Sequence, residues 1–233
     1  MTGSSTNVAI IPARGGSKRI PRKNIKPFAG QPMISYSIQA AIKSNLFDRV
    51  LVSTDSEEIA AVAKEYGAEV PFIRPPDLSD DQTATAPVIA HTLNWLSQAG
   101  TPATYACCIY ATAPFVRAQD IISGLDVLKN NHAATAFTVT SFPFPIFRAL
   151  KIGAAGTLEM LWPEHKLTRS QDLPETFHDA GQFYWLDVAR FMKAPELYGA
   201  DSRPIILPRY LVQDIDTPED WETAEHMFQA LQK

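Results

Sequence analysis

Short apolar runs alternate with amphipathic helical patterns through the first 140 residues. Apolar runs at 8–11, 50–53, 69–73, 105–109 and 134–140 predict buried strands. Between them, residues 32–45, 57–66, 85–99 and 118–130 place apolar side chains at helical spacing. The alternation is typical of βαβ units, so the sequence predicts an α/β fold with a mainly parallel sheet, helices on both faces and right-handed crossovers.

The pattern changes after residue 140. Residues 142–148 are rich in proline and aromatics, 153–156 read as a hairpin turn, and 162–177 show no helical period. Strand patterns return at 177–185, 205–208 and 211–216, and Thr217 and Pro218 predict the start of a last helix. We therefore predict one domain over 1–233 with an inserted arm at about 141–178, whose exposed apolar face requires a partner.

The composition narrows the class of protein. The hydrophobic content of 45% is ordinary for a globular chain with a core, and no apolar run reaches the length of a membrane span. Met1 to Asn7 is polar and uncharged, unlike a signal peptide, so we expect a cytoplasmic protein without a membrane partner. The net charge of -4 argues against nucleic-acid binding. Cys107 and Cys108 are adjacent in an apolar run and predict reduced core thiols.

A basic loop directly follows the first predicted strand. It contains paired glycines and five cationic side chains, and no Asp or Glu precedes Asp48. Ligands of α/β proteins bind at the carboxyl ends of strands, so the loop predicts an anion site, with a polyphosphate as the natural ligand. A solvated basic face is the alternative. The loop is neither a P-loop nor a dinucleotide fingerprint.

The residues of this loop form a long, ordered motif. Residues 11–24 read Ile-Pro-Ala-Arg-Gly-Gly-Ser-Lys-Arg-Ile-Pro-Arg-Lys-Asn, which resembles the opening signature of the CMP-sialic acid synthetase (acylneuraminate cytidylyltransferase) family. The resemblance implies a Rossmann-like nucleotidyltransferase whose first loop wraps CTP. It assigns nucleotide contacts to Arg14, Gly15, Ser17, Lys18, Asn24, Arg74 and Thr112, and catalytic roles to Arg14, Lys23, Asp214 and Asp216.

Asp214 and Asp216 form a second candidate motif. On the strand predicted for 211–216, residues two apart point to one face, so the two carboxylates converge. Two like charges in one place cost free energy unless a cation or a shared proton offsets them. In the resembled family this Asp-x-Asp holds the catalytic Mg²⁺, and either aspartate or a metal-bound hydroxide is a candidate general base. Asp55 is predicted to cap the helix that follows it.

The resemblance also covers the sugar site. Residues 110–114 read Tyr-Ala-Thr-Ala-Pro where the sialic acid enzymes usually have Gln-Pro-Thr-Ser-Pro, and Ala180 replaces an asparagine. Both departures resemble the pseudaminic branch of the family. The sugar-binding candidates are Tyr110, Arg148, Arg169, Asp179 and Gln182. The two arginines are expected to grip the sugar carboxylate, although surface positions would explain them equally, and Gln182 could instead satisfy backbone groups.

The function implied is transfer of CMP from CTP to a nine-carbon 2-keto sugar acid by a Mg²⁺-dependent homodimer, for bacterial surface glycans or flagellin. Pseudaminic acid is the expected acceptor, and N-acetylneuraminic, legionaminic and 3-deoxy-manno-octulosonic acids are the alternatives. A catalytically inactive nucleotide-sugar sensor could dispense with the Asp pair, which this chain has. A nicotinamide oxidoreductase would need the missing glycine fingerprint.

Overall fold

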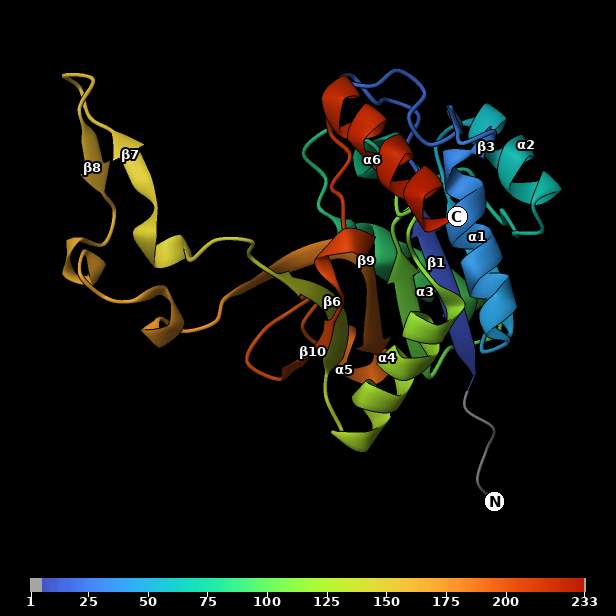
Figure 1. The fold of residues 1–233 in the computed structure, drawn as a ribbon. Helices are drawn as coiled ribbons and strands as arrows, with labels where there is room; N and C mark the ends of the chain where they lie inside the picture. The colour runs from blue at the N-terminus through green and yellow to red at the C-terminus, as the bar shows by residue number, and fades with distance from the viewer. Residues whose placement is uncertain (1–5, 233) are drawn as a thin grey trace.

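The computed structural model describes residues 6–232, and its centre is a six-stranded sheet in the order β10-β6-β9-β5-β1-β4 (Figure 1). The strands are β1 (Asn7–Pro12), β4 (Arg49–Ser53), β5 (Tyr105–Ile109), β6 (Thr135–Ser141), β9 (Phe177–Asp187) and β10 (Ser202–Ile206). Only β9 runs against its neighbours, so the predicted mainly parallel sheet is confirmed. Most of the Met1–Asn7 stretch, tested above for a signal peptide, lies outside the described residues.

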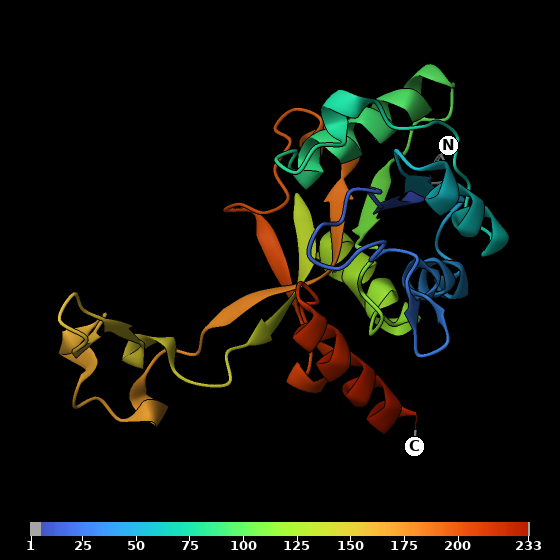
Figure 2. The ribbon, with the colours of Figure 1, turned by 90° about the horizontal axis from the view of Figure 1, so that it is seen from above.

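Helices cover both faces of this sheet, as predicted (Figure 2). They are α1 (Met33–Ser44), α2 (Glu57–Glu65), α3 (Thr85–Gln98), α4 (Ala118–Asn130), α5 (Val188–Phe191) and α6 (Pro218–Leu231). The helix starts follow from capping side chains: Ser56 accepts the Ile59 amide at α2, and Thr217 and Asp220 form a capping box at α6. In the part of the chain described, no helix has the length and apolar character needed to cross a bilayer.

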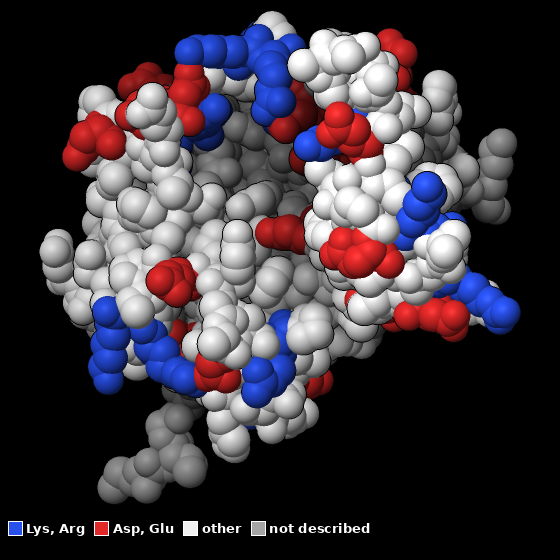
Figure 3. All heavy atoms as spheres, turned by 90° about the vertical axis from the view of Figure 1, so that its left-hand side faces the viewer, with Lys and Arg blue, Asp and Glu red and all other residues white. Residues whose placement is uncertain are grey.

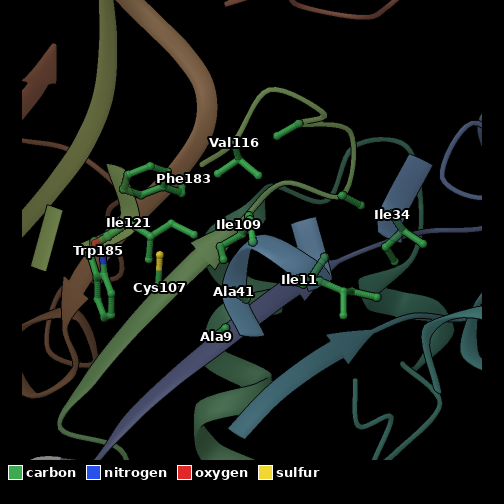
Figure 4. Close-up of a cluster of buried hydrophobic side chains, with 14 of the residues drawn as sticks. Ala9, Ile11, Ile34, Ala41, Cys107, Ile109, Val116, Ile121, Phe183 and Trp185 are labelled. Carbon is green, nitrogen blue, oxygen red and sulfur yellow. Dashed lines mark hydrogen bonds between the residues drawn. The ribbon is translucent and has the colours of Figure 1, made fainter. Parts of the chain in front are cut away.

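Alternate residues of β1 point into two separate halves of the core. Ala9 and Ile11 pack with α1 and α4 (Figure 4), whereas Val8 and Ile10 pack with α3. The adjacent cysteines divide in the same way, since Cys107 belongs to the first half and Cys108 to the second. Both are free and buried, and burial raises the pKa of both thiols, so they are the inert core residues that the sequence predicted.

The chain leaves the sheet between β6 and β9 and forms a projecting arm (Figure 1). The two ends of the arm are held side by side, because Ser141 pairs with Phe177 in the ladder of β6 and β9. The arm carries the hairpin of β7 (Leu150–Ile152) and β8 (Leu158–Met160), with the predicted turn between them. Its other segments are short 3-10 turns, in agreement with the missing helical period.

Two predicted strands are wrong. Residues 69–73 make only isolated bridges, at Glu69 and Ile73, because Pro71 between them has no amide proton to donate to a ladder. Residues 211–216 form the end of a 3-10 turn (Arg209–Leu211) and then unpaired chain. A small antiparallel pair, β2 (Pro27–Phe28) with β3 (Gln31–Pro32), completes the first loop before α1 begins.

Candidate functional site

A cleft of about 510 Å³ opens at the carboxyl ends of β1 and β5. At β1 the strand order reverses, since β4 lies on one side of it and β5 on the other, and such a switch point is where α/β sheets bind ligands. The predicted residues that line the cleft are Arg14, Ser17, Lys18, Lys23, Asn24, Arg74, Tyr110, Thr112 and Asp216. Figure 3 views the molecule from the side of the arm and shows a hollowed face with charged side chains at its upper rim.

The first loop, which follows β1, is held by two polar contacts. The Gly15 amide donates to Oδ1 of Asp55 at 2.8 Å, and Nδ2 of Asn24 donates to the Arg14 carbonyl at 2.9 Å. The prediction that Asp55 caps α2 is therefore wrong. Ser56 is the capping residue, and the Asp55 side chain reaches the first loop instead. Asn24 is buried and uses its amide nitrogen to close the loop, while it still lines the cleft.

An apolar cluster brings the Asp pair to this loop. Ile20 and Ile215 are 2% and 1% exposed and pack together with Phe28, Met33 and Trp221. Burying Ile215 fixes the aspartates on either side of it at the loop, and the start of α6 lies beside the loop at the top of Figure 1. The two carboxylates are thus positioned by the packing of Ile215 and not by the strand that the sequence predicted.

Cations of the first loop meet Asp216 directly. Nζ of Lys23 donates to the Ile215 carbonyl and lies 3.4 Å from Oδ1 of Asp216, while Arg19 lies 2.9 Å from Oδ2. Desolvation by the surrounding chain, and then the negative charge of Asp216, raise the pKa of Asp214. The charge of Lys23 offsets this repulsion only in part, and a further cation at the pair would relieve it.

The donor set at the pair suits Mg²⁺. Within residues 6–232 no group of three His, Cys, Asp or Glu side chains is placed to hold a metal ion. An ion here would have at most two protein carboxylates and would take its remaining oxygens from substrate phosphates and water, which is the usual way that proteins bind Mg²⁺. Asp216 lines the cleft, whereas Asp214 is not among the lining residues.

The second loop, residues 74–83, closes the opposite wall of the cleft. Arg74 is only 4% exposed; its Nε donates to Oγ of Ser79 at 3.2 Å. Burial lowers the pKa of Arg74, and the charge of Asp55 opposes that change. At the open edge, Asp81 pairs with Arg14 at 2.7 Å and with Lys18. Sequence reasoning missed Asp81, although it assigned Arg74, at the start of the same loop, to the nucleotide.

Of the candidate sugar-binding residues in the main domain, Tyr110 lines the cleft, whereas Asp179 and Gln182 do not. Tyr110 lies in the cleft wall, with its hydroxyl 3.4 Å from Oγ1 of Thr85 and its ring beside Tyr184. Tyr184, which the sequence did not single out, donates to Asp179. Gln182 is 3% exposed and donates to the Leu211 carbonyl at 2.6 Å, so the structure places it in a backbone-satisfying position and outside the cleft lining.

Comparison with known proteins decides the family. The family described as Cytidylyltransferase matches residues 8–201. The chain belongs to the cytidylyltransferase family. It is thus a nucleotidyltransferase, as the first loop led us to expect. Its sequence is 40% identical to the pseudaminic acid cytidylyltransferase of Campylobacter jejuni, over 95% of this chain and 96% of that one.

More distant relatives agree with this placement. The CMP-N,N'-diacetyllegionaminic acid synthase of Legionella pneumophila is 30% identical over 97% of each chain. A solved structure of CMP:2-keto-3-deoxy-manno-octonic acid synthetase complexed with CTP superimposes with a TM-score of 0.69, at 16% identity, over 97% of this chain and 100% of that one. At that identity the likeness shows the fold, and it confirms the Rossmann-like architecture predicted for this cytidylyltransferase.

The two arginines predicted for the sugar carboxylate lie in the arm. Arg148 and Arg169 are both exposed, and neither lines the cleft of the cytidylyltransferase domain. Arg148 donates to the Thr168 carbonyl, within the arm itself. Because the arm projects from the domain, these side chains do not join the cleft residues of their own chain (Figure 2).

Proposed function

We propose that this cytidylyltransferase transfers CMP from CTP to pseudaminic acid, giving CMP-pseudaminic acid and pyrophosphate. The carrying observation is that one cleft gathers the cations of the first loop and Asp216 at the switch point of the sheet. The acceptor follows from the relative in Campylobacter jejuni, which covers nearly the whole chain, and from the shared departures at residues 110–114 and 180.

The side chains of the cleft divide the chemistry between them. Arg14, Lys18 and Lys23 surround the triphosphate and offset its charge, while Asn24, Arg74 and Thr112 hold the nucleoside end. A hydroxyl of the sugar acid attacks the α-phosphorus in line, the bond to the bridging oxygen breaks, and pyrophosphate leaves. Most of the rate enhancement comes from positioning and from charge neutralisation, as in other phosphoryl transfers.

Asp214 and Asp216 would hold Mg²⁺. When bound, the ion would supply positive charge that stabilises the negative charge developing on the phosphate oxygens. Either aspartate is a candidate for accepting the proton of the attacking hydroxyl. Lys23 and Arg19 keep Asp216 oriented before substrates arrive.

The arm would complete the site through a homodimer. Residues 150 and 152 of β7 and residues 158 and 160 of β8 form one apolar face, whereas Lys151 and Glu159 pair at 3.3 Å on the other. An exposed apolar face of this kind is buried by a second copy of the chain. The arm would then carry Arg148 and Arg169 to the carboxylate of a sugar bound in the neighbouring cleft. We place the reaction in the cytoplasm, where CTP is made.

The direct test is pyrophosphate release by the purified protein with CTP and Mg²⁺, comparing pseudaminic, legionaminic, N-acetylneuraminic and 3-deoxy-manno-octulosonic acids. We expect fast release with pseudaminic acid and at least about tenfold slower release with the others, since their ring substituents would leave polar groups of the site unpaired. Omission of the acceptor is the control for CTP hydrolysis. Preference for another acid would overturn the acceptor, and CTP binding without release for any acid would favour a sensor.

A further inference from the structure

Asp55 lies just outside the cleft and contacts both nucleotide loops. Its Oδ1 accepts the Gly15 amide of the first loop at 2.8 Å and lies 3.8 Å from the Arg74 guanidinium of the second. Asp55 itself does not line the cleft. It stands at the end of β4, where the preceding residue, Thr54, is fully buried and its carbonyl accepts the Arg74 amide at 2.8 Å. The carboxylate is therefore fixed to the sheet.

The first loop approaches this carboxylate very closely. A Cβ atom added to Gly15 would lie 3.2 Å from Cβ of Ser56 and 3.8 Å from Oδ2 of Asp55. The glycine does not have a positive φ angle, so the position needs it for space and not for backbone freedom. The short side chain lets the amide reach Asp55, and this fixes the turn from which Arg14 and Ser17 enter the cleft.

The second loop depends on the charge of the same carboxylate. Arg74 is almost completely buried, and among residues 6–232 Asp55 is the only carboxylate within 4.0 Å of its guanidinium. Breaking a buried ion pair by removing one partner is costly, because the remaining charge is left uncompensated. Nε of Arg74 holds Ser79, whose hydroxyl donates to the Pro75 carbonyl at 2.8 Å. A displacement of Arg74 would thus be transmitted to the loop.

We propose that Asp55 is a positioning residue for CTP, which sets the first loop through a hydrogen bond and the second through its charge. The proposal rests on CTP binding in the cleft, as in the proposed function. The two contributions can be separated chemically. Asn at position 55 keeps an oxygen that accepts the Gly15 amide but removes the charge that compensates Arg74, whereas Ala removes both.

The test is calorimetric titration of CTP into the full-length protein for wild type, Asp55→Asn and Asp55→Ala. We expect CTP binding to weaken about tenfold in Asp55→Asn and about a hundredfold in Asp55→Ala, the range for hydrogen bonds to charged groups and for buried groups left unpaired. Glu57→Gln is the matched control. It removes the same charge two residues away, at an exposed position in the first turn of α2 that makes no ion pair with any residue of 6–232, and should bind CTP as the wild type does.

A double-mutant cycle distinguishes positioning from a general loss of stability. In an Arg74→Gln background, Asp55→Asn should weaken CTP binding no further, since the charge it compensates is gone. The double variant leaves no buried unpaired charge, so it remains measurable even where Asp55→Asn unfolds. Wild-type affinity in Asp55→Asn, or additive effects in the cycle, would overturn the proposal. Absence of CTP binding by the wild type would instead overturn the proposed function.

Discussion

The nucleotide cleft and the arm differ in whether their side chains already have partners within the chain. In the cleft, the charged groups already have partners within the chain, such as Arg14 with Asp81 and Lys23 with Asp216. In the arm, Phe144, Ile152 and Leu167 are 79%, 77% and 91% exposed. The difference teaches that the cleft is organised before any ligand arrives, whereas the arm keeps the large apolar surface for which we propose a second copy of the chain.

The largest expected effect is on turnover, when the Asp216 carboxylate is removed from the cleft. Asp216→Ala should lower turnover at least about a hundredfold, because electrostatic stabilisation at a phosphoryl-transfer site is lost together with the ligand that we propose for Mg²⁺. CTP should still bind, since Lys23 and Arg19 remain. Single-turnover kinetics and a CTP titration measure the two quantities. Glu219→Ala, an exposed acid in the first turn of α6, is the control, and normal turnover in Asp216→Ala would remove the metal assignment.

An intermediate effect is expected when the apolar face of the arm is made polar. Replacing Ile152 and Leu158 together by Lys should convert the proposed dimer to a monomer, since the pair would bring two charges from each copy into the proposed interface. The matched control exchanges Lys151 and Glu159, which lie on the other face and keep their pairing. Light scattering after gel filtration gives the mass. A dimer that persists in the double Lys variant would place the interface elsewhere.

The smallest effect is expected at the open edge of the cleft. Asp81 pairs with Arg14 and Lys18 in the free protein, where the triphosphate would bind. Asp81→Asn should therefore tighten CTP binding, by roughly two- to fivefold, because exposed ion pairs are weak. The gain should shrink at high salt. Asp77→Asn in the same loop is the control, and weaker CTP binding in Asp81→Asn would show that the carboxylate helps to hold CTP.

Secondary structure was predicted correctly from the sequence where a local pattern of apolar residues determines it. The strand at 105–109 and the helix at 118–130 were predicted to the residue, because apolar periodicity fixes both. The strand at 69–73 failed because Pro71 removes a ladder donor, a cue present in the sequence and not weighed.

Contacts between distant segments were harder to predict. Three such contacts depend on tertiary packing that no local sequence pattern encodes. They join Ile20 to Ile215, Gly15 to Asp55 and Arg14 to Asp81. The motif at 11–24 identified the residues of the first loop, but it gave no sign that Asp55 holds that loop from outside. The roles of Arg148 and Arg169 depend on a second copy of the chain, and they stay predictions.

The way in which the arm joins the sheet has a consequence for how the chain can change over evolutionary time. Since Ser141 and Phe177 are already paired, the sheet closes the loop whatever its length. Each doubling of a flexible loop costs only about 0.6 kcal/mol of additional closure entropy. The arm can thus gain, lose or exchange residues with little penalty to the domain that carries it, so the surface offered to a partner can drift while the residues of the nucleotide cleft are retained.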